Sequence, residues 1–206
     1  MKDTVIVFAR APRLGAVKRR LARGIGDRAA LRFHTATLTA LLRDLTSCRR
    51  LNVVLAVTPD RAFVRLPPRV QRIEQGHGDV GTRMTRALSR YPKGRAALIG
   101  CDIPQAGSGD IRAALRGLGT ADAVFGPAAD GGYWLIALGP RRPAELFGPA
   151  RWSTEHALAD TLNQFRHRRT NFVRTLHDVD TIADWRHWQH WQSAGSSTPK
   201  PHPDLA

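Results

Sequence analysis

Residues 4–21 read TVIVFARAPRLGAVKRRL, a short apolar run that turns directly into a basic loop. The run from Thr4 to Ala9 is rich in β-branched residues and is typical of a buried strand. Similar runs follow at Asn52–Val57 and Ala96–Gly100, and segments with helical spacing, such as Arg28–Leu45, separate them. This alternation predicts βαβ units and a mainly parallel sheet with helices on both faces. Shorter expected elements are a strand that includes Val70 and Ile73, and helices near Val80–Ser89 and Ser108–Leu118.

The pattern changes in the second half of the chain. Ala121–Pro127 and Tyr133–Leu138 read as two strands, and the run AADGG between them favours a turn, which predicts an antiparallel hairpin. We expect a helix near Thr154–Phe165, with Ser153 as its N-cap, and a last helix near Ile182–Trp191. The sequence therefore predicts a three-layer α/β/α sandwich whose mainly parallel sheet contains one hairpin.

Length and composition fit one domain. A chain of 206 residues with 42% hydrophobic residues can bury a core, and we assign residues 1–191 to a single domain. The polar, Pro-rich residues 192–206 predict a disordered tail. Trp185, Trp188 and Trp191, three residues apart, indicate core packing rather than a ligand platform.

Cellular location is predicted from what the sequence lacks. No apolar run is long enough to span a membrane, and we find no signal peptide. The two cysteines, Cys48 and Cys101, have neither metal-ligand spacing nor the density of a disulfide scaffold. We therefore expect a cytoplasmic protein.

The charge balance is unusual, with 32 Lys and Arg against 17 Asp and Glu and a formal net charge of +15. Such a surplus predicts attraction to polyanions, which include nucleic acid, nucleotide diphosphates and phosphorylated substrates. A solvated Arg-rich surface without a function is the alternative. The sequence has no basic-aromatic interleaving and no recognisable nucleic-acid motif, so we expect no specific nucleic-acid partner.

The basic loop after the first strand is a candidate phosphate site. Gly15 lets the backbone approach a ligand, and a loop of this kind can bind a diphosphate through N–H groups and guanidinium contacts. The loop matches neither a Walker A motif nor a GxGxxG fingerprint, and a solvated basic loop is the alternative. Its cations are Arg10, Arg13, Lys18, Arg19 and Arg20.

A Gly-rich turn, QGHGDVGTRM at residues 75–84, precedes a predicted helix. Gln75 and Asp79 are candidates to bind a base edge or ribose hydroxyls, and Arg83 is a candidate phosphate ligand. Asp79 could instead cap the helix.

Three further aspartates are candidates. Asp102 and Asp130 lie where a predicted strand or hairpin ends, as ligand-binding residues of open α/β sheets do, and Asp180 lies just before the last predicted helix. Asp102, in IGCDIP, is the candidate ligand for Mg²⁺ or Mn²⁺, and Asp180, in HDVDT, is a candidate second ligand. Asp130, in GPAADGGYWL, lies at an open turn that a second substrate could approach. The alternatives are structural: a cap at Asp102, a plain β-turn at Asp130, and an N-cap at Asp178 or Asp180.

Taken in order, these segments resemble a family of small GT-A-fold proteins described as nucleotide-diphospho-sugar transferase-like, or DUF2064. The family pattern consists of six motifs in order: F-x-R-x-P-x-x-G-x-x-K-T-R-L, Q-G-x-G-D-L-G-x-R-M, G-x-D-x-P, G-P-x-x-D-G-G-Y, W-S-T and D-x-D-T. The corresponding segments of this chain, in the same order, are FARAPRLGAVKRRL, QGHGDVGTRM, GCDIP, GPAADGGYWL, WST and DVDT. Arg19 replaces the usual Thr, and Ile182 and Ala183 replace a common Pro-Glu.

The resemblance implies a role for each motif. It places the nucleotide diphosphate on Arg10, Gly15, Lys18 and Arg20, the nucleoside near Gln75, Gly76 and Asp79, the metal on Asp102 and Asp180, and the acceptor near Asp130, Gly131, Gly132 and Tyr133.

The predicted function is metal-dependent glycosyl transfer from a nucleotide-diphospho-sugar to a small-molecule acceptor. Asp102, Asp130 and Lys18 are the candidate catalytic residues, and Asp130 is the candidate base. The alternative is nucleotidyl transfer to a phosphorylated small molecule with release of pyrophosphate, and a nucleic-acid-binding protein is a third interpretation. The nucleotide base, sugar, acceptor, stereochemical course and oligomeric state stay open.

Overall fold

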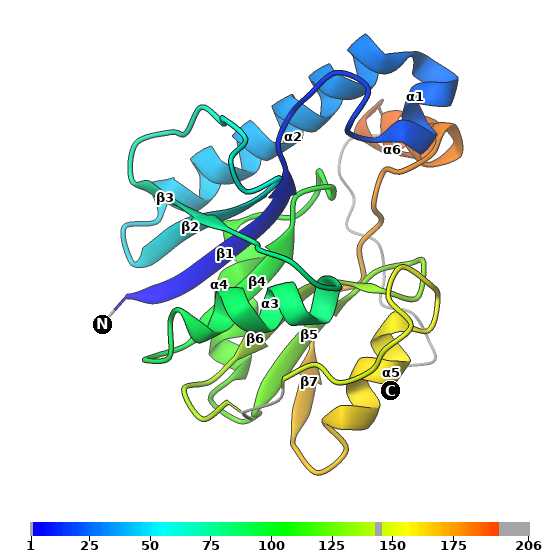
Figure 1. The fold of residues 1–206 in the computed structure, drawn as a ribbon. Helices are drawn as coiled ribbons and strands as arrows, with labels where there is room; N and C mark the ends of the chain where they lie inside the picture. Colours follow the sequence, from blue (N-terminus) through cyan, green and yellow to red (C-terminus); the bar gives the residue numbers. More distant parts are fainter. Residues whose placement is uncertain (1, 143–145, 194–206) are drawn as a thin grey trace.

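A seven-stranded sheet with the order β3-β2-β1-β4-β6-β5-β7 organises the computed structural model, which describes residues 2–142 and 146–193 (Figure 1). The strands are β1 (Asp3–Arg10), β2 (Leu51–Thr58), β3 (Val70–Glu74), β4 (Ala96–Gly100), β5 (Ala123–Pro127), β6 (Tyr133–Leu138) and β7 (Thr170–Phe172). The helices are α1 (Arg19–Ile25), α2 (Asp27–Ser47), α3 (Val80–Ser89), α4 (Ser108–Gly117), α5 (Ala157–Gln164) and α6 (Ile182–Ser193).

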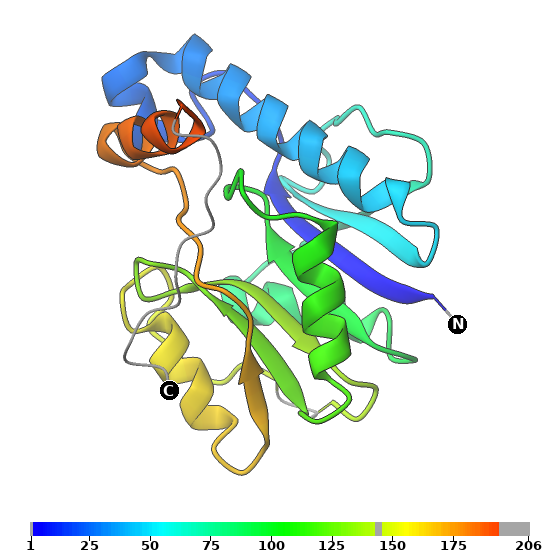
Figure 2. The same ribbon diagram turned by 180° about the vertical axis from the view of Figure 1, so that it is seen from behind.

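Helices cover both faces of the sheet because its strands are apolar on both sides. Val5 and Val7 of β1 belong to the core beneath α2 and α4, whereas Ile6, between them, belongs to the core beneath α3 and α5. Figures 1 and 2 show the two helical layers from opposite sides. Burying one such aliphatic side chain contributes about 1.5–3 kcal/mol to folding. The predicted three-layer α/β/α architecture is confirmed.

Strand direction brings distant segments to one edge of the sheet. β1 is parallel to β2 and β4, and β2 is parallel to β3. β6 is antiparallel to both β4 and β5, so β5 and its parallel neighbour β7 again run in the direction of β4. The segments that follow β1, β3, β4, β5 and β7 therefore emerge at the same edge, and β5–β6 is the predicted hairpin.

The aromatic residues of α6 attach this helix to the start of α2. The Phe33 ring packs edge-on against Trp185 and Trp188, with centroids 5.0 and 5.2 Å apart. The prediction that the Trp stripe packs rather than forms an open platform is confirmed for these two residues. Because α1 also contacts α6, the segments that precede both helices are held close together.

Several boundaries differ from the prediction. Ser153 is not an N-cap: α5 begins at Ala157 with His156 as the N-cap, and Ser153 lies in a turn with φ 63°. The hydroxyl of Thr154 donates to the Arg151 carbonyl and accepts from the His156 N–H, which closes this turn before the helix starts. α6 continues to Ser193, so residues 192 and 193 are helical, and the rest of the predicted tail lies outside the described residues.

None of the helices in residues 2–142 and 146–193 has the length and hydropathy that crossing a bilayer requires.

Candidate active site

Lys18 lies at the centre of the edge where the strand ends meet. Its side chain is only 6% exposed, and its Nζ lies 2.6 Å from a carboxylate oxygen of Asp180 and 3.4 Å from one of Asp102. Burial alone would lower the pKa of Lys18, but the two carboxylates raise it. The residue is the N-cap of α1 and has left-handed backbone angles, φ 48° and ψ 44°. A non-glycine residue seldom adopts this conformation, and such outliers concentrate at functional sites.

Backbone contacts bring Asp102 and Asp180 to Lys18 from remote parts of the chain. Asp102 follows β4, and its carbonyl accepts a hydrogen bond of 3.3 Å from the Val179 N–H. Arg20 also pairs with Asp180. Burial acts to raise the pKa of Asp180, but Lys18 and Arg20 lower it overall. The carboxylates therefore face cations at the start of α1.

The start of α6 is capped without Asp178 or Asp180. The Asp184 carboxylate accepts the Thr181 N–H at 2.7 Å, and the Thr181 hydroxyl accepts the Asp184 N–H at 3.3 Å. This reciprocal pair is a capping box with Asp in the place of Glu. The N-cap alternative for Asp178 and Asp180 is therefore wrong, and both carboxylates are available to the site.

A polar cleft of about 610 Å³ lies around Lys18. Its wall is cationic because both Arg10 and Arg83 line it, and burial first and then the charge of Arg10 lower the pKa of Arg83. Two guanidinium groups that repel each other in this way provide a binding site for an anion. Predicted residues that line the cleft are Arg10, Lys18, Arg20, Gln75, Arg83, Asp102 and Asp180.

Gln75 positions Arg83. The buried amide of Gln75 donates to the carbonyls of Ala9 and Ala56, and its oxygen accepts from Arg83 at 2.9 Å. The amide thus joins the ends of β1 and β2 and orients the guanidinium toward the cleft. Both N–H donors of Gln75 are used in this way, so a ligand could reach only the second lone pair of its oxygen without breaking one of these bonds.

The other residues predicted to contact the nucleoside lie outside the walls of this cleft. Asp79 caps α3 by accepting the Thr82 N–H at 2.8 Å, which is the structural alternative considered for it. Gly76, with φ 75°, lies against the guanidinium of Arg86. Gly15, with φ 71°, allows the turn of the first loop but likewise does not line the cleft.

His34 is a residue of the cleft that sequence analysis did not select. It is 4% exposed, and its Nε2 lies 3.0 Å from the Arg10 carbonyl, so that nitrogen must carry the proton. Burial lowers the pKa of His34, which favours the neutral ring. Its place on the buried face of α2, one turn after Ala30, was the available signal.

A second cavity of about 200 Å³ adjoins the cleft and shares Val80, Gly100, Asp102 and Ser153 with it. Its further lining combines aromatic and acidic residues with aliphatic and small ones, and among the described residues it includes no Lys, Arg or His. Its chemically distinctive residues are Asp102, Asp130, Asp178, Tyr133, Trp134 and Trp152, with Gly132 also in the wall. The two cavities therefore have opposite charge.

Glycines allow the two tryptophans to form this wall. A Cβ on Gly81 would come within 2.6 Å of the Trp152 ring, and one on Gly126 within 2.5 Å of the Trp134 ring. Gly131, with φ 84°, would meet the backbone of Glu155 in the same way. Gly131 does not line the cavity; it permits the hairpin turn to approach the segment before α5.

Asp178 is a second residue that sequence analysis did not assign to the site. The Leu176 carbonyl accepts the Ala129 N–H at 3.0 Å, which ties the segment before Asp178 to the β5–β6 turn. Burial first, and then the carboxylates of Asp180, Asp130 and Asp102, raise the pKa of Asp178 to about 6. Its signal in the sequence was the spacing of two residues from Asp180.

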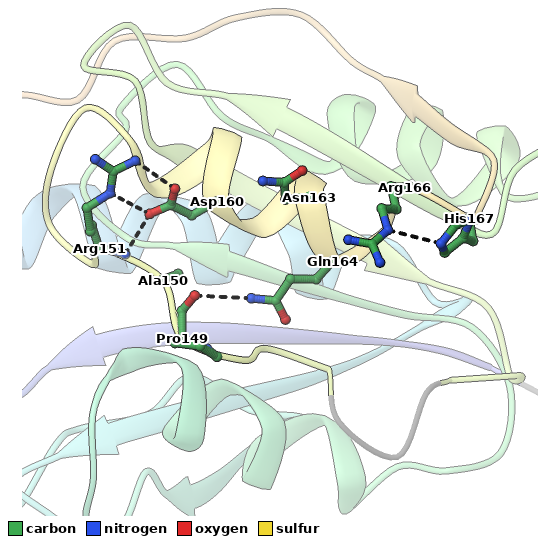
Figure 3. A pocket seen from close by; sticks show the side chains of 8 residues that line it. All are labelled: Pro149, Ala150, Arg151, Asp160, Asn163, Gln164, Arg166 and His167. Atoms are coloured by element: carbon green, nitrogen blue, oxygen red, sulfur yellow. Dashed lines mark hydrogen bonds and ion pairs between the residues drawn. The ribbon is translucent and has the colours of Figure 1, made fainter.

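A further hollow of about 670 Å³ lies over α5, away from both cavities (Figure 3). The Arg151 guanidinium binds both oxygens of Asp160 there, and the Gln164 amide donates to the Pro149 carbonyl. Arg166 donates to the neighbouring His167. These contacts hold the turn onto α5, and none of these residues lines the cleft or the second cavity.

The fold and the paired cavities define an α/β protein with a nucleotide-sized polar cleft at the carboxyl ends of its strands. The chain belongs to the DUF2064 family, described as an uncharacterized protein conserved in bacteria, whose profile matches residues 41–154. The match includes Asp79, Asp102 and Asp130 but neither the first loop nor Asp180. No curated protein matches the chain.

Solved structures share the fold. A crystal structure from Desulfovibrio desulfuricans G20, provisionally described as a nucleotide-diphospho-sugar transferase, is 25% identical with a TM-score of 0.87 and covers 96% of this chain and 90% of that chain. The 4-diphosphocytidyl-2C-methyl-D-erythritol synthase of Anaerococcus prevotii DSM 20548 is 10% identical, with a TM-score of 0.58 and coverages of 93% and 98%. A Mycobacterium tuberculosis H37Rv protein in complex with manganese is 17% identical, with a TM-score of 0.51 and coverages of 91% and 97%. The last two establish the fold alone.

Proposed function

We propose that the protein is a transferase that moves a sugar from a nucleotide-diphospho-sugar to an acceptor hydroxyl. The observation that carries this proposal is the pair of adjoining cavities with opposite charge, which meet at Asp102. The cationic cleft suits the diphosphate of a donor, and the acidic, aromatic cavity suits an uncharged or cationic acceptor. Structural similarity to the Desulfovibrio desulfuricans G20 protein supports the same class of reaction.

The residues of the cleft would stabilise the leaving group. When the bond between the anomeric carbon and the diphosphate breaks, negative charge grows on the departing phosphate oxygen. Lys18, Arg10 and Arg83 are already placed in the cleft wall, so they need little reorganisation during the reaction. Loss of one such donor typically costs about 10²–10³ in rate.

Asp102 and Asp180 would supply carboxylate oxygens to a divalent cation. The described residues contain no group of three or more possible ligands, so the diphosphate would have to complete its coordination. Mg²⁺ and Mn²⁺ prefer oxygen ligands and commonly take one or two carboxylates together with substrate phosphates. Lys18 bridges these carboxylates, so an ion would share them with its ammonium group. When bound, the metal would polarise the diphosphate and stabilise its charge.

Asp130 is the proposed base. Its side chain is exposed at the mouth of the acidic cavity, where one oxygen accepts the Gly132 N–H at 2.9 Å. In the proposed step the acceptor oxygen bonds to the anomeric carbon, and the bond from that carbon to the diphosphate oxygen breaks. The hydroxyl proton passes to the Asp130 carboxylate, and the nucleoside diphosphate leaves with the bonding electron pair.

Nucleotidyl transfer uses a related fold, but the second cavity argues against a phosphorylated acceptor. Such an acceptor would bring about two negative charges next to Asp102, Asp130 and Asp178, and no cation among the described residues lines that cavity. Recognition of a phosphate normally requires Arg, Lys or several N–H groups. We therefore prefer sugar transfer.

Product analysis separates the two reactions. Thermal shift with nucleoside diphosphates, triphosphates and sugar nucleotides, each with Mg²⁺ or Mn²⁺, first identifies the nucleotide. We expect nucleoside diphosphates and intact sugar nucleotides to stabilise the protein, and turnover to release nucleoside diphosphate. Pyrophosphate release from a triphosphate that depends on Asp102 would overturn the proposal in favour of nucleotidyl transfer.

A further inference from the structure

We propose that the acidic, aromatic cavity selects an acceptor that carries a positive charge close to its attacking hydroxyl, such as an amino sugar or amino alcohol. This inference rests on the proposed function, because it names the class of acceptor for that reaction.

Charge pairing within the site supports this assignment. Lys18 and Arg20 pair with Asp102 and Asp180, and both cations line the cleft rather than the second cavity. Among the described residues, Asp130 and Asp178 form no ion pair, and no side chain donates a hydrogen bond to either of them. The second cavity therefore retains negative charge that a cationic ligand would neutralise.

The aromatic wall supports the same ligand. Tyr133, Trp134 and Trp152 line the cavity together with the two unpaired carboxylates. Aromatic faces attract an ammonium group, and the contact is stronger where water is excluded. A wall made of aliphatic side chains would not add this preference for a cation.

The size of the cavity limits the ligand. At about 200 Å³ it is smaller than the roughly 300–1,000 Å³ typical of drug-sized ligand sites. A single sugar ring or a short amino alcohol is the appropriate scale, whereas an oligosaccharide would have to extend out of the cavity.

Three sugars with the same ring size but different charges test the inference. Glucosamine, glucose and glucuronate differ mainly in charge, and their affinities can be measured by NMR titration at pH 7 with saturating Mg²⁺ in every sample. We expect glucosamine to bind at least about tenfold more tightly than glucose, and glucuronate to bind most weakly. In Asp178→Asn and Asp130→Asn the preference for glucosamine should fall to about twofold or less.

Asp122→Asn is the matched control, because it removes the same charge from a residue outside both cavities. It should keep the full preference for glucosamine. Equal binding of the three sugars to the native protein, no binding of any of them, or a preference that survives in both cavity variants would overturn the inference. If a variant does not fold, the series on the native protein still decides.

The outcome is independent of the donor reaction. The titration needs neither nucleotide nor turnover, so a native protein that prefers glucosamine but releases no nucleoside diphosphate would contradict the proposed function alone. Turnover with neutral acceptors, combined with no charge preference in the titration, would contradict only the cationic acceptor.

Discussion

Replacing Asp178 with asparagine should stabilise the ligand-free protein at pH 8. The carboxyl of Asp178 is half-buried, forms no ion pair among the described residues, and lies near three other carboxylates. Asparagine has nearly the same shape but stays neutral, so the substitution removes the cost of burying a charge, and also the repulsion, without leaving a void. A stabilising substitution inside a site is the expected sign of a residue kept for function.

The size of the effect follows from the pKa. Burial and the neighbouring carboxylates raise the pKa of Asp178 from 3.8 to about 6, a shift that corresponds to about 3 kcal/mol. Solvent screens part of this at a half-exposed side chain, so we expect about 1–2 kcal/mol. For a chain of this size, that raises the melting temperature by roughly 2–8 °C.

The pH dependence has a definite sign. Because the pKa is higher in the folded than in the unfolded chain, the folded state binds the proton more tightly between about pH 4 and pH 6. The native protein therefore loses this stability as the pH rises through that range, and the full cost is present above pH 6. The advantage of Asp178→Asn should be complete at pH 8 and shrink to about a third near pH 4.5.

Thermal melts of both proteins at pH 8 and pH 4.5, in buffer with chelator, measure the effect. Asp180→Asn provides the matched control, because Lys18 and Arg20 lower the pKa of Asp180 against the effect of burial. That variant should melt at a lower temperature than the native protein at pH 8. If Asp178→Asn destabilises the protein at pH 8, or gains the same amount at both pH values, then the burial and crowding of an ionised Asp178 are not the cause.

Three other substitutions test separate parts of the site. Lys18→Met should lose most of the thermal stabilisation that nucleoside diphosphate gives and lower turnover by about 10²–10³. If nucleoside diphosphate stabilises this variant as much as the native protein, the ammonium group does not contact the diphosphate. Asp102→Ala should remove the Mn²⁺ dependence of nucleotide stabilisation without unfolding the chain, and unchanged dependence would exclude this carboxylate as a metal ligand. Gly131→Ala should lower the free energy of unfolding by about 1–3 kcal/mol in urea titrations, because φ is 84° and the new Cβ would meet the Glu155 backbone. An unchanged free energy of unfolding would contradict that close approach.

Residue patterns predicted the buried elements well because those elements are apolar. The strands at Thr4–Ala9, Asn52–Val57 and Ala96–Gly100 could be recognised because burial on both faces leaves a continuous apolar run. α1 was missed because RRLARGI is basic and buries only Leu21. β7 was missed because its three residues, TNF, are largely exposed and form an edge strand beside β5.

The site was predicted in part for a related reason. Lys18, Asp102 and Asp130 each follow a strand or lie in a turn, and the parallel direction of the strands brings such residues together. Asp178 could not be selected in this way, because its environment comes from the β5–β6 turn and from the segment after β4. Hydrogen bonds from Ala129 to Leu176 and from Val179 to Asp102 make these connections, and no local pattern records them.

The formal net charge of +15 reflects cations on the rest of the protein, because acidic residues are concentrated at the candidate site. Four of the 17 acidic residues, Asp102, Asp130, Asp178 and Asp180, converge at the edge of the sheet, so the basic cleft directly adjoins the acidic cavity. A surface evolved for a long polyanion gains from continuous positive potential, and carboxylates within it oppose binding. The proposed reaction would use such a boundary, because the charged diphosphate of the donor would lie in the basic cleft and the acceptor in the acidic cavity. Lys18 lies at this boundary, because it lines the basic cleft and pairs with the carboxylates of Asp102 and Asp180.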